Sequence, residues 1–208
     1  MILPAPESAP RTSRSRSARP SGPIGVLALQ GGFAAHARSL EALGHEVALV
    51  RTTADLAACA GLVLPGGEST VQLRLLDREG LEAPLAAFAA SGKPVLATCA
   101  GLILAASRVL DPEQRSLGLL DVTVRRNAWG RQLASFEARD DSGAIPVVAI
   151  RAPRVAGVGP RVEVLATLDG EPILVRERNV TGATFHPELT DHLGVHASVF
   201  GAAANVLA

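Results

Sequence analysis

The sequence has no long uninterrupted apolar run. Apolar residues make up 48% of the 208, but charged or turn-forming residues interrupt every stretch of about 18 residues, the length that a membrane-spanning helix requires. The opening MILPAPESAP lacks the basic start and apolar run of a secretory signal. We therefore expect a cytoplasmic protein that has no contact with a membrane.

Cysteine and lysine are scarce. The two cysteines, Cys59 and Cys99, cannot form a disulfide framework and are too few for a cysteine-rich zinc site. Nineteen arginines stand against one lysine, Lys93, which we attribute to genome composition. A surplus of basic residues is also missing, since the formal net charge is zero, and nucleic-acid binders normally carry one. We predict no nucleic-acid partner.

The composition changes near residue 23. Residues 1–22 contain five Ser, four Pro and four Arg, with Glu7 as the single acidic residue and no periodic apolar pattern. This composition predicts a disordered leader, either a species-specific extension or the product of an upstream start codon, or else a basic arm that touches nucleic acid or a partner. We expect residues 23–208 to form a single domain.

Short apolar runs alternate with helical patterns after the leader. The runs IGVLAL, EVALV, GLVLP and PVLATC predict buried strands, and the segments between them have helical spacing. The second half contains more strand-like segments separated by turn residues, and HASVFGAAANVLA predicts a closing helix. We predict an α/β fold of three layers, flavodoxin-like, with a mostly parallel sheet, helices on both faces and an antiparallel extension.

Cys99 lies where a buried strand runs directly into a predicted helix, in KPVLATCAGLILAAS. Small residues, Ala97 and Gly101, stand two positions before and after it, as the sharp bend of a nucleophile elbow requires. A helix N-terminus favours the thiolate, and the N–H of Ala100 would face a developing oxyanion. The alternative is a buried structural cysteine, which is how we interpret Cys59.

His186 is the best candidate for a base. It follows the strand-like run VTGATF and precedes Pro187 and Glu188. In an extended segment residues i and i+2 project to the same side, so Glu188 can orient one ring nitrogen while the other accepts a proton from Cys99. The early histidines His36 and His45 have surface or core roles by default.

Two further features are candidate ligand sites. In GLVLPGGEST a strand enters Gly66–Gly67 and then a helix capped by Ser69 or Thr70. This loop is either a second oxyanion donor with a substrate cradle or a plain β–α turn, and it lacks the lysine of a phosphate loop. His192 and His196 have metal-ligand spacing, but no third ligand is evident. We predict neither a metal nor a cofactor.

These segments together resemble the class I (triad) glutamine amidotransferases, and more narrowly the glutaminase subunits of pyridoxal 5′-phosphate synthase. The resemblance runs from Ile24 to about Leu207 and rests on six motifs: LALQG, LPGGEST, TCAGLI, RRNAWGRQ, IRAP and FHPELT. Two positions depart from the family pattern. Ala97 replaces a usual Gly, and Ala35 replaces the usual Glu before His36, near the expected partner surface together with Gln30.

The resemblance implies hydrolysis of glutamine, with ammonia passed to a separate β/α-barrel synthase subunit. It implies that Cys99 is the nucleophile, His186 the general base and acid, and Glu188 its orienter. The backbone of Gly67 and Ala100 would form the oxyanion hole. The implied substrate-binding residues are Gly67, Glu68, Ser69, Arg126, Ile150 and Arg151. The sequence does not rank the two arginines for the glutamine carboxylate.

Three alternatives remain open at this point. The chain could be a glutaminase that feeds another synthase, such as the imidazole glycerol phosphate branch. It could be a cysteine hydrolase of the flavodoxin-like peptidase or chaperone group, in which a histidine often follows the cysteine directly, whereas Ala100 stands here. It could also be a non-catalytic partner subunit.

Overall fold

A computed structural model describes residues 21–126 and 135–201 and arranges seven strands in one large sheet. The strands are β1 (Ile24–Leu27), β2 (Val47–Val50), β3 (Gly61–Leu64), β4 (Val95–Thr98), β10 (Glu163–Leu168), β11 (Glu171–Glu177) and β12 (Val180–Ala183). Their order is β10-β11-β12-β4-β3-β1-β2, with the five from β12 to β2 parallel and β11 and β10 antiparallel. This is the flavodoxin-like order with an antiparallel extension, so the predicted fold class is confirmed.

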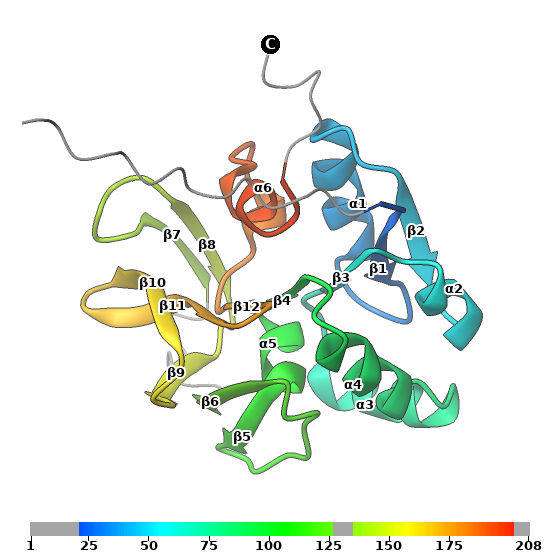
Figure 1. Cartoon of the computed structure of the whole chain (residues 1–208). Helices are drawn as coiled ribbons and strands as arrows, with labels where there is room; N and C mark the ends of the chain where they lie inside the picture. Colours follow the sequence, from blue (N-terminus) through cyan, green and yellow to red (C-terminus); the bar gives the residue numbers. More distant parts are fainter. Residues whose placement is uncertain (1–20, 127–134, 202–208) are drawn as a thin grey trace, which may run out of the picture.

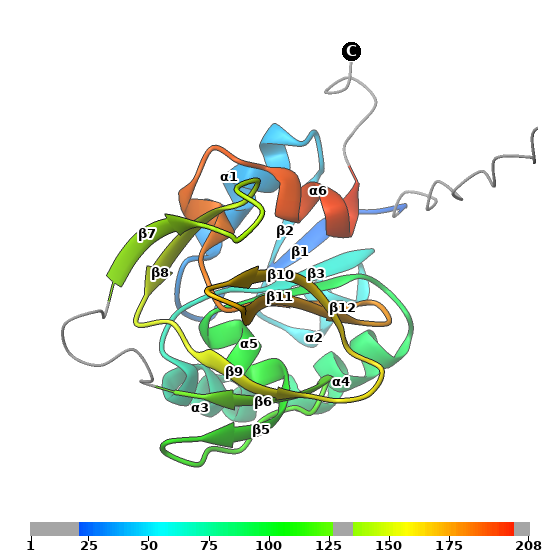
Figure 2. The same ribbon diagram turned by 90° about the vertical axis from the view of Figure 1, so that its left-hand side faces the viewer.

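Helices cover both faces of this sheet, as Figures 1 and 2 show. They are α1 (Phe33–Ala42), α2 (Thr53–Ala57), α3 (Ser69–Arg78), α4 (Glu82–Ala90), α5 (Ala100–Ala105) and α6 (Gly194–Phe200). Successive strand residues point to opposite faces. In β3, Val63 therefore packs in one buried cluster with Leu40 of α1 and Phe200 of α6, whereas Leu62 packs in the other with Leu76 of α3.

Two smaller sheets flank the large one. β5 (Ala106–Leu110), β6 (Leu120–Arg125) and β9 (Arg154–Val158) form one, and β7 (Ser135–Arg139) and β8 (Pro146–Ile150) form an antiparallel pair. The sequence did not predict β9. The predicted helix after Cys99 is α5, which ends at Ala105, and β5, which the sequence also did not predict, follows at once. The N–H groups of Leu117 and Leu119 bind the carbonyls of Leu104 and Ala105 and so satisfy the end of this short helix.

Some predictions fall on residues outside the described ranges. They include most of the predicted leader, at 1–20, much of the RRNAWGRQ motif, at 127–132, and the end of the predicted closing helix, at 202–208. The described part of that helix is α6, which ends at Phe200. Within the two described ranges, every helix is too short or too polar to span a membrane. The domain boundary at residue 23 stays a prediction.

Candidate active site

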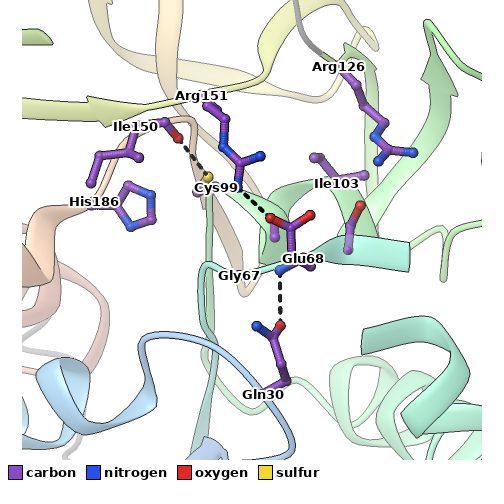
Figure 3. Close-up of a pocket in the computed structure, with 11 residues that line it drawn as sticks. Gln30, Gly67, Glu68, Cys99, Ile103, Arg126, Ile150, Arg151 and His186 are labelled. Atoms are coloured by element: carbon purple, nitrogen blue, oxygen red, sulfur yellow. Dashed lines mark hydrogen bonds and ion pairs between the residues drawn. The ribbon is translucent and has the colours of Figure 1, made fainter. Parts of the chain in front are cut away.

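A pocket of about 210 Å³ opens at the carboxyl ends of the parallel strands. This edge of an open α/β sheet is where ligands usually bind. Figure 3 shows its lining residues, which lie at or after the ends of β1, β3, β4, β6, β8 and β12 in the chain. They are Gln30, Gly67, Glu68, Ser69, Cys99, Ala100, Ile103, Arg126, Ile150, Arg151 and His186. Every substrate-binding residue implied by the family resemblance lies in this one pocket.

The backbone turns sharply at Cys99, between β4 and α5. Its φ is 48° and its ψ is −106°, in a region that residues with a side chain seldom occupy. A Cβ at Gly101 would lie 2.0 Å from the carbonyl oxygen of Leu64, so only glycine lets α5 approach β3 this closely. The predicted strand–turn–helix bend is therefore present. It places the thiol sulfur in the pocket, 3.9 Å from the carbonyl oxygen of Ile150.

His186 and Glu188 form the predicted hydrogen-bonded pair, with 2.7 Å between Nδ1 and Oε1. The segment is not extended as expected, because Pro187–Leu189 form a single 3₁₀ turn that begins directly after His186. Proline fits the first position of such a turn since it needs no backbone donor there. The turn buries the carboxylate of Glu188, whose exposed fraction is 7%, and leaves the ring of His186 at the pocket wall.

The cysteine and histidine meet across Gly66. A Cβ at this position would lie 2.4 Å from Cε1 of His186 and 3.4 Å from Cβ of Cys99. Burial alone lowers the pKa of His186, but hydrogen bonds to Cys99 and Glu188 and their negative charges outweigh it and raise the pKa to about 10. Burial raises the pKa of Glu188, whereas its bond to His186 and the charges of His36 and His186 bring it below the usual value. The site thus favours a protonated imidazole hydrogen-bonded to an ionised Glu188.

The glycine loop closes the pocket from the β3 side. A Cβ at Gly67 would lie 2.5 Å from Oε1 of Gln30, and this oxygen accepts a 2.9 Å hydrogen bond from the N–H of Glu68. The expectation that Ser69 or Thr70 caps α3 is wrong. Glu68 occupies the cap position without a side-chain cap bond, and the hydroxyls of Ser69 and Thr70 instead donate to Oε1 of Gln114.

The two candidate arginines have different partners. Arg151, at a φ of 46°, forms an ion pair with the carboxylate of Glu68. Arg126 donates from Nη1 to Oε1 of Gln114 at 2.7 Å. Among the described residues no carboxylate neutralises Arg126, so its charge is available to a ligand in the pocket. The pocket therefore offers one compensated and one uncompensated guanidinium.

Two residues at the site were not predicted. Gln114 lies between β5 and β6, and no motif around it signals that it would hold Arg126. His36 is fully buried, and its Nε2 lies 3.2 Å from Oε2 of Glu188. In the sequence, His36 stands out only because it belongs to the family's Glu–His pattern in the first helix. The sequence alone gave no reason to place it behind Glu188.

The histidine pair at i, i+4 does not form a ligand set. His196 is fully buried against His36, whereas His192 is exposed and lies two residues before α6 begins. No group of three or more His, Cys, Asp or Glu side chains in the described ranges is arranged to hold a metal ion. Cys59 is buried, as the structural interpretation expects.

Comparison with known proteins assigns the chain to a family. Residues 26–200 match the SNO glutamine amidotransferase family. The Pyridoxal 5′-phosphate synthase subunit PdxT of Corynebacterium jeikeium is 51% identical over 180 residues, which cover 83% of this chain and 92% of the relative. The protein of the same name from Thermotoga maritima is 46% identical over 178 residues, which cover 83% of this chain and 95% of the relative.

A solved structure of a glutamine amidotransferase superposes with a TM-score of 0.80 at 41% identity, over 86% of this chain and 97% of the other. The resemblance drawn from the motifs is confirmed. The chain belongs to the SNO glutamine amidotransferase family.

Proposed function

We propose that this protein hydrolyses L-glutamine to L-glutamate and ammonia through a thioester on Cys99. The observation that carries the proposal is the convergence of Cys99 and His186, from two distant parts of the chain, at one pocket, with Glu188 hydrogen-bonded to His186 behind it. Family membership supports the amide chemistry, and the name of the relatives supports the use of the ammonia in pyridoxal 5′-phosphate synthesis.

The reaction begins with the thiolate of Cys99, paired with protonated His186. The sulfur attacks the side-chain amide carbon, and His186 donates its proton to the departing ammonia. His186 then accepts a proton from the water that cleaves the γ-glutamyl thioester. Glu188 holds Nδ1 of the ring throughout, so Nε2 remains the nitrogen that exchanges protons with the substrate.

The remaining pocket residues match the other groups of glutamine. The N–H groups of Ala100 and Gly67 are the proposed oxyanion donors, since both residues line the pocket beside the thiol. Arg126 is the proposed partner of the α-carboxylate because no carboxylate among the described residues pairs with its charge. Glu68 and the carbonyl of Ile150 are acceptors for the ammonium group.

We further propose a cytoplasmic hetero-oligomer with a barrel-type synthase subunit that consumes the ammonia. The test is glutamate release by the full chain with and without that synthase subunit. We expect release in its presence, and none from a Cys99→Ala variant that still co-purifies with the synthase. Normal glutamine turnover by Cys99→Ala would refute the nucleophile assignment. Activation only by the cyclase subunit of imidazole glycerol phosphate synthase would assign the ammonia to another reaction.

A further inference from the structure

A buried row of polar side chains continues behind Glu188, away from Cys99. His36 of α1 is fully buried, and its Nε2 lies 3.0 Å from Oγ1 of Thr98 and 3.2 Å from Oε2 of Glu188. Its Nδ1 lies 2.9 Å from Nε2 of His196 in α6, which is also fully buried. Three elements, α1, β4 and α6, thus contribute polar groups to a row in which His36 faces the carboxylate that holds His186.

The protonation of these groups follows from their surroundings. Burial lowers the pKa of His36 to about 4, although the charge of Glu188 opposes this, and burial with the nearby charge of His36 lowers the pKa of His196 to about 3. Both rings are therefore neutral near pH 7, whereas Glu188, with its lowered pKa, is ionised. A neutral ring beside an ionised carboxylate must present an N–H to it, because a lone pair would repel the oxygen.

One arrangement of protons gives each ring N–H of His36 and His196 a hydrogen-bond partner. The proton of His36 lies on Nε2, which faces Thr98 and Glu188, and Nδ1 of His36 then accepts from Nε2–H of His196. This leaves Nδ1 of His196 as a bare acceptor, and it is a buried atom without a hydrogen-bond partner among the described residues. A buried acceptor without a partner is tolerated more readily than a buried N–H without one.

Glu188 depends on this row for one of its two oxygens. Oε1 is bound by His186, but Oε2 is buried and has no hydrogen-bond donor of good geometry in the part of the chain that the structure describes. The ring nitrogen of His36 is the polar group that faces it, and that nitrogen is directed mainly at Thr98. Removing the nitrogen would leave a buried carboxylate oxygen facing apolar space, and Glu188 would turn away from its present position.

We propose that His36, held in its Nε2–H tautomer by His196, is a positioning residue that fixes the Glu188 carboxylate and thereby aims His186 at Cys99. This rests on the proposed glutaminase function and assigns a further residue to it. His36 touches neither the pocket nor the substrate, so it acts through Glu188 alone.

The kinetic test uses the full chain in complex with its synthase subunit. His36→Leu fills the space but lacks a donor, whereas His36→Gln keeps an N–H and an acceptor. We expect His36→Leu to lower kcat by roughly 10- to 100-fold with KM unchanged, as a misplaced catalytic group does, and His36→Gln to recover most of the activity. His45→Leu is the matched control, because His45 also loses a 2.7 Å bond, to Gly201, without facing Glu188. Wild-type kcat in His36→Leu, or equal losses in the Leu and Gln variants, would overturn the proposal.

Two further measurements do not depend on glutamine turnover. Nitrogen-15 NMR of the unsubstituted full chain should show His36 as the Nε2–H tautomer, and a proton on Nδ1 would overturn the proposal. The pH profile of Cys99 alkylation by iodoacetamide, in a Cys59→Ser background, should move to higher pH in His36→Leu and not in His36→Gln. An unmoved profile in His36→Leu would also overturn it.

These readouts keep the two proposals separable. Absence of glutamate release by the unsubstituted complex would defeat the proposed function, whatever the tautomer of His36. An active unsubstituted complex with an unaltered His36→Leu variant would defeat the positioning role alone.

Discussion

Cys99 holds a backbone conformation that costs an L-residue on the order of 1–3 kcal/mol, and the surrounding structure maintains it. The residue lies between a fully buried strand and a fully buried helix, and its N–H binds the carbonyl of Ala183 at 2.9 Å. A merely structural cysteine would not need this conformation. The strain is therefore the feature of this residue that most favours the catalytic interpretation.

At the same scale, substitutions can show which of Arg126 and Arg151 binds the carboxylate of glutamine. Arg126→Gln should raise KM for glutamine by roughly 10- to 100-fold, the equivalent of one charged hydrogen bond, with a smaller effect on kcat. Arg151→Gln should change KM less, because Glu68 already compensates the charge of Arg151. Steady-state glutamate release by the complex measures both. A larger KM effect from Arg151→Gln would reverse the assignment.

Sequence reasoning found the site residues that carry motifs and missed those that do not. Cys99 and His186 were identified from local patterns, an elbow and a His-x-Glu pair. His36 was assigned a default role because a histidine in an amphipathic helix gives the same sequence pattern whether it only packs in the core or also positions a catalytic group. Its function depends on α1 lying against the 3₁₀ turn at Pro187–Leu189, a contact that only the tertiary fold creates.

At the scale of elements, the parallel strands were predictable and their neighbours were less so. Continuous apolar runs bounded by Gly and Pro marked β1, β3 and β4 correctly. The run after Cys99 is just as apolar and predicted a helix without fixing its end, and α5 stops after six residues. Propensity did not decide this end, because the carbonyls of α5 are taken by N–H groups from residues beyond β5.

The close crossing of α5 and β3 gives a prediction for Gly101. Gly101→Ala would place a Cβ 2.0 Å from the backbone oxygen of Leu64, which cannot move away without disturbing β3. We expect a loss of roughly 1–3 kcal/mol of unfolding free energy, as for other overpacked sites, together with loss of glutaminase activity. Chemical denaturation measures the first effect.

Gly157→Ala is the matched control for this substitution. Its Cβ would meet only Thr123, at 3.8 Å, and Gly157 has no positive φ. The control should therefore unfold like the unsubstituted protein. Equal stability of the Gly101 and Gly157 variants would show that the approach of α5 to β3 is not as tight as described.

At the scale of the whole molecule, the buried histidines link stability to pH. His36 and His196 titrate near 6.5 when unfolded but at about 4 and about 3 in the fold, so between these values the unfolded chain binds more protons. The free energy of unfolding should therefore fall as the pH drops from 6.5 towards 4, by up to roughly 3 kcal/mol for His36 alone. Urea denaturation across this range measures the loss.

His186, at the pocket, links the free energy of unfolding to pH in the opposite direction. The pKa of His186 is raised to about 10, so the stability that it contributes is complete below pH 6.5 and is lost as the pH rises through 10. A His36→Gln variant should flatten the acid side of the profile and leave this alkaline side in place. An acid side of unchanged slope in that variant would contradict the assignment to His36.

The most direct test of the whole account is to find the covalent intermediate. The active complex would be mixed with glutamine, quenched in acid within the first turnovers and digested for peptide mass spectrometry. We expect a γ-glutamyl thioester on Cys99 and none on Cys59, which is buried away from the pocket. An active complex that releases glutamate while Cys99 never carries the adduct would contradict the account.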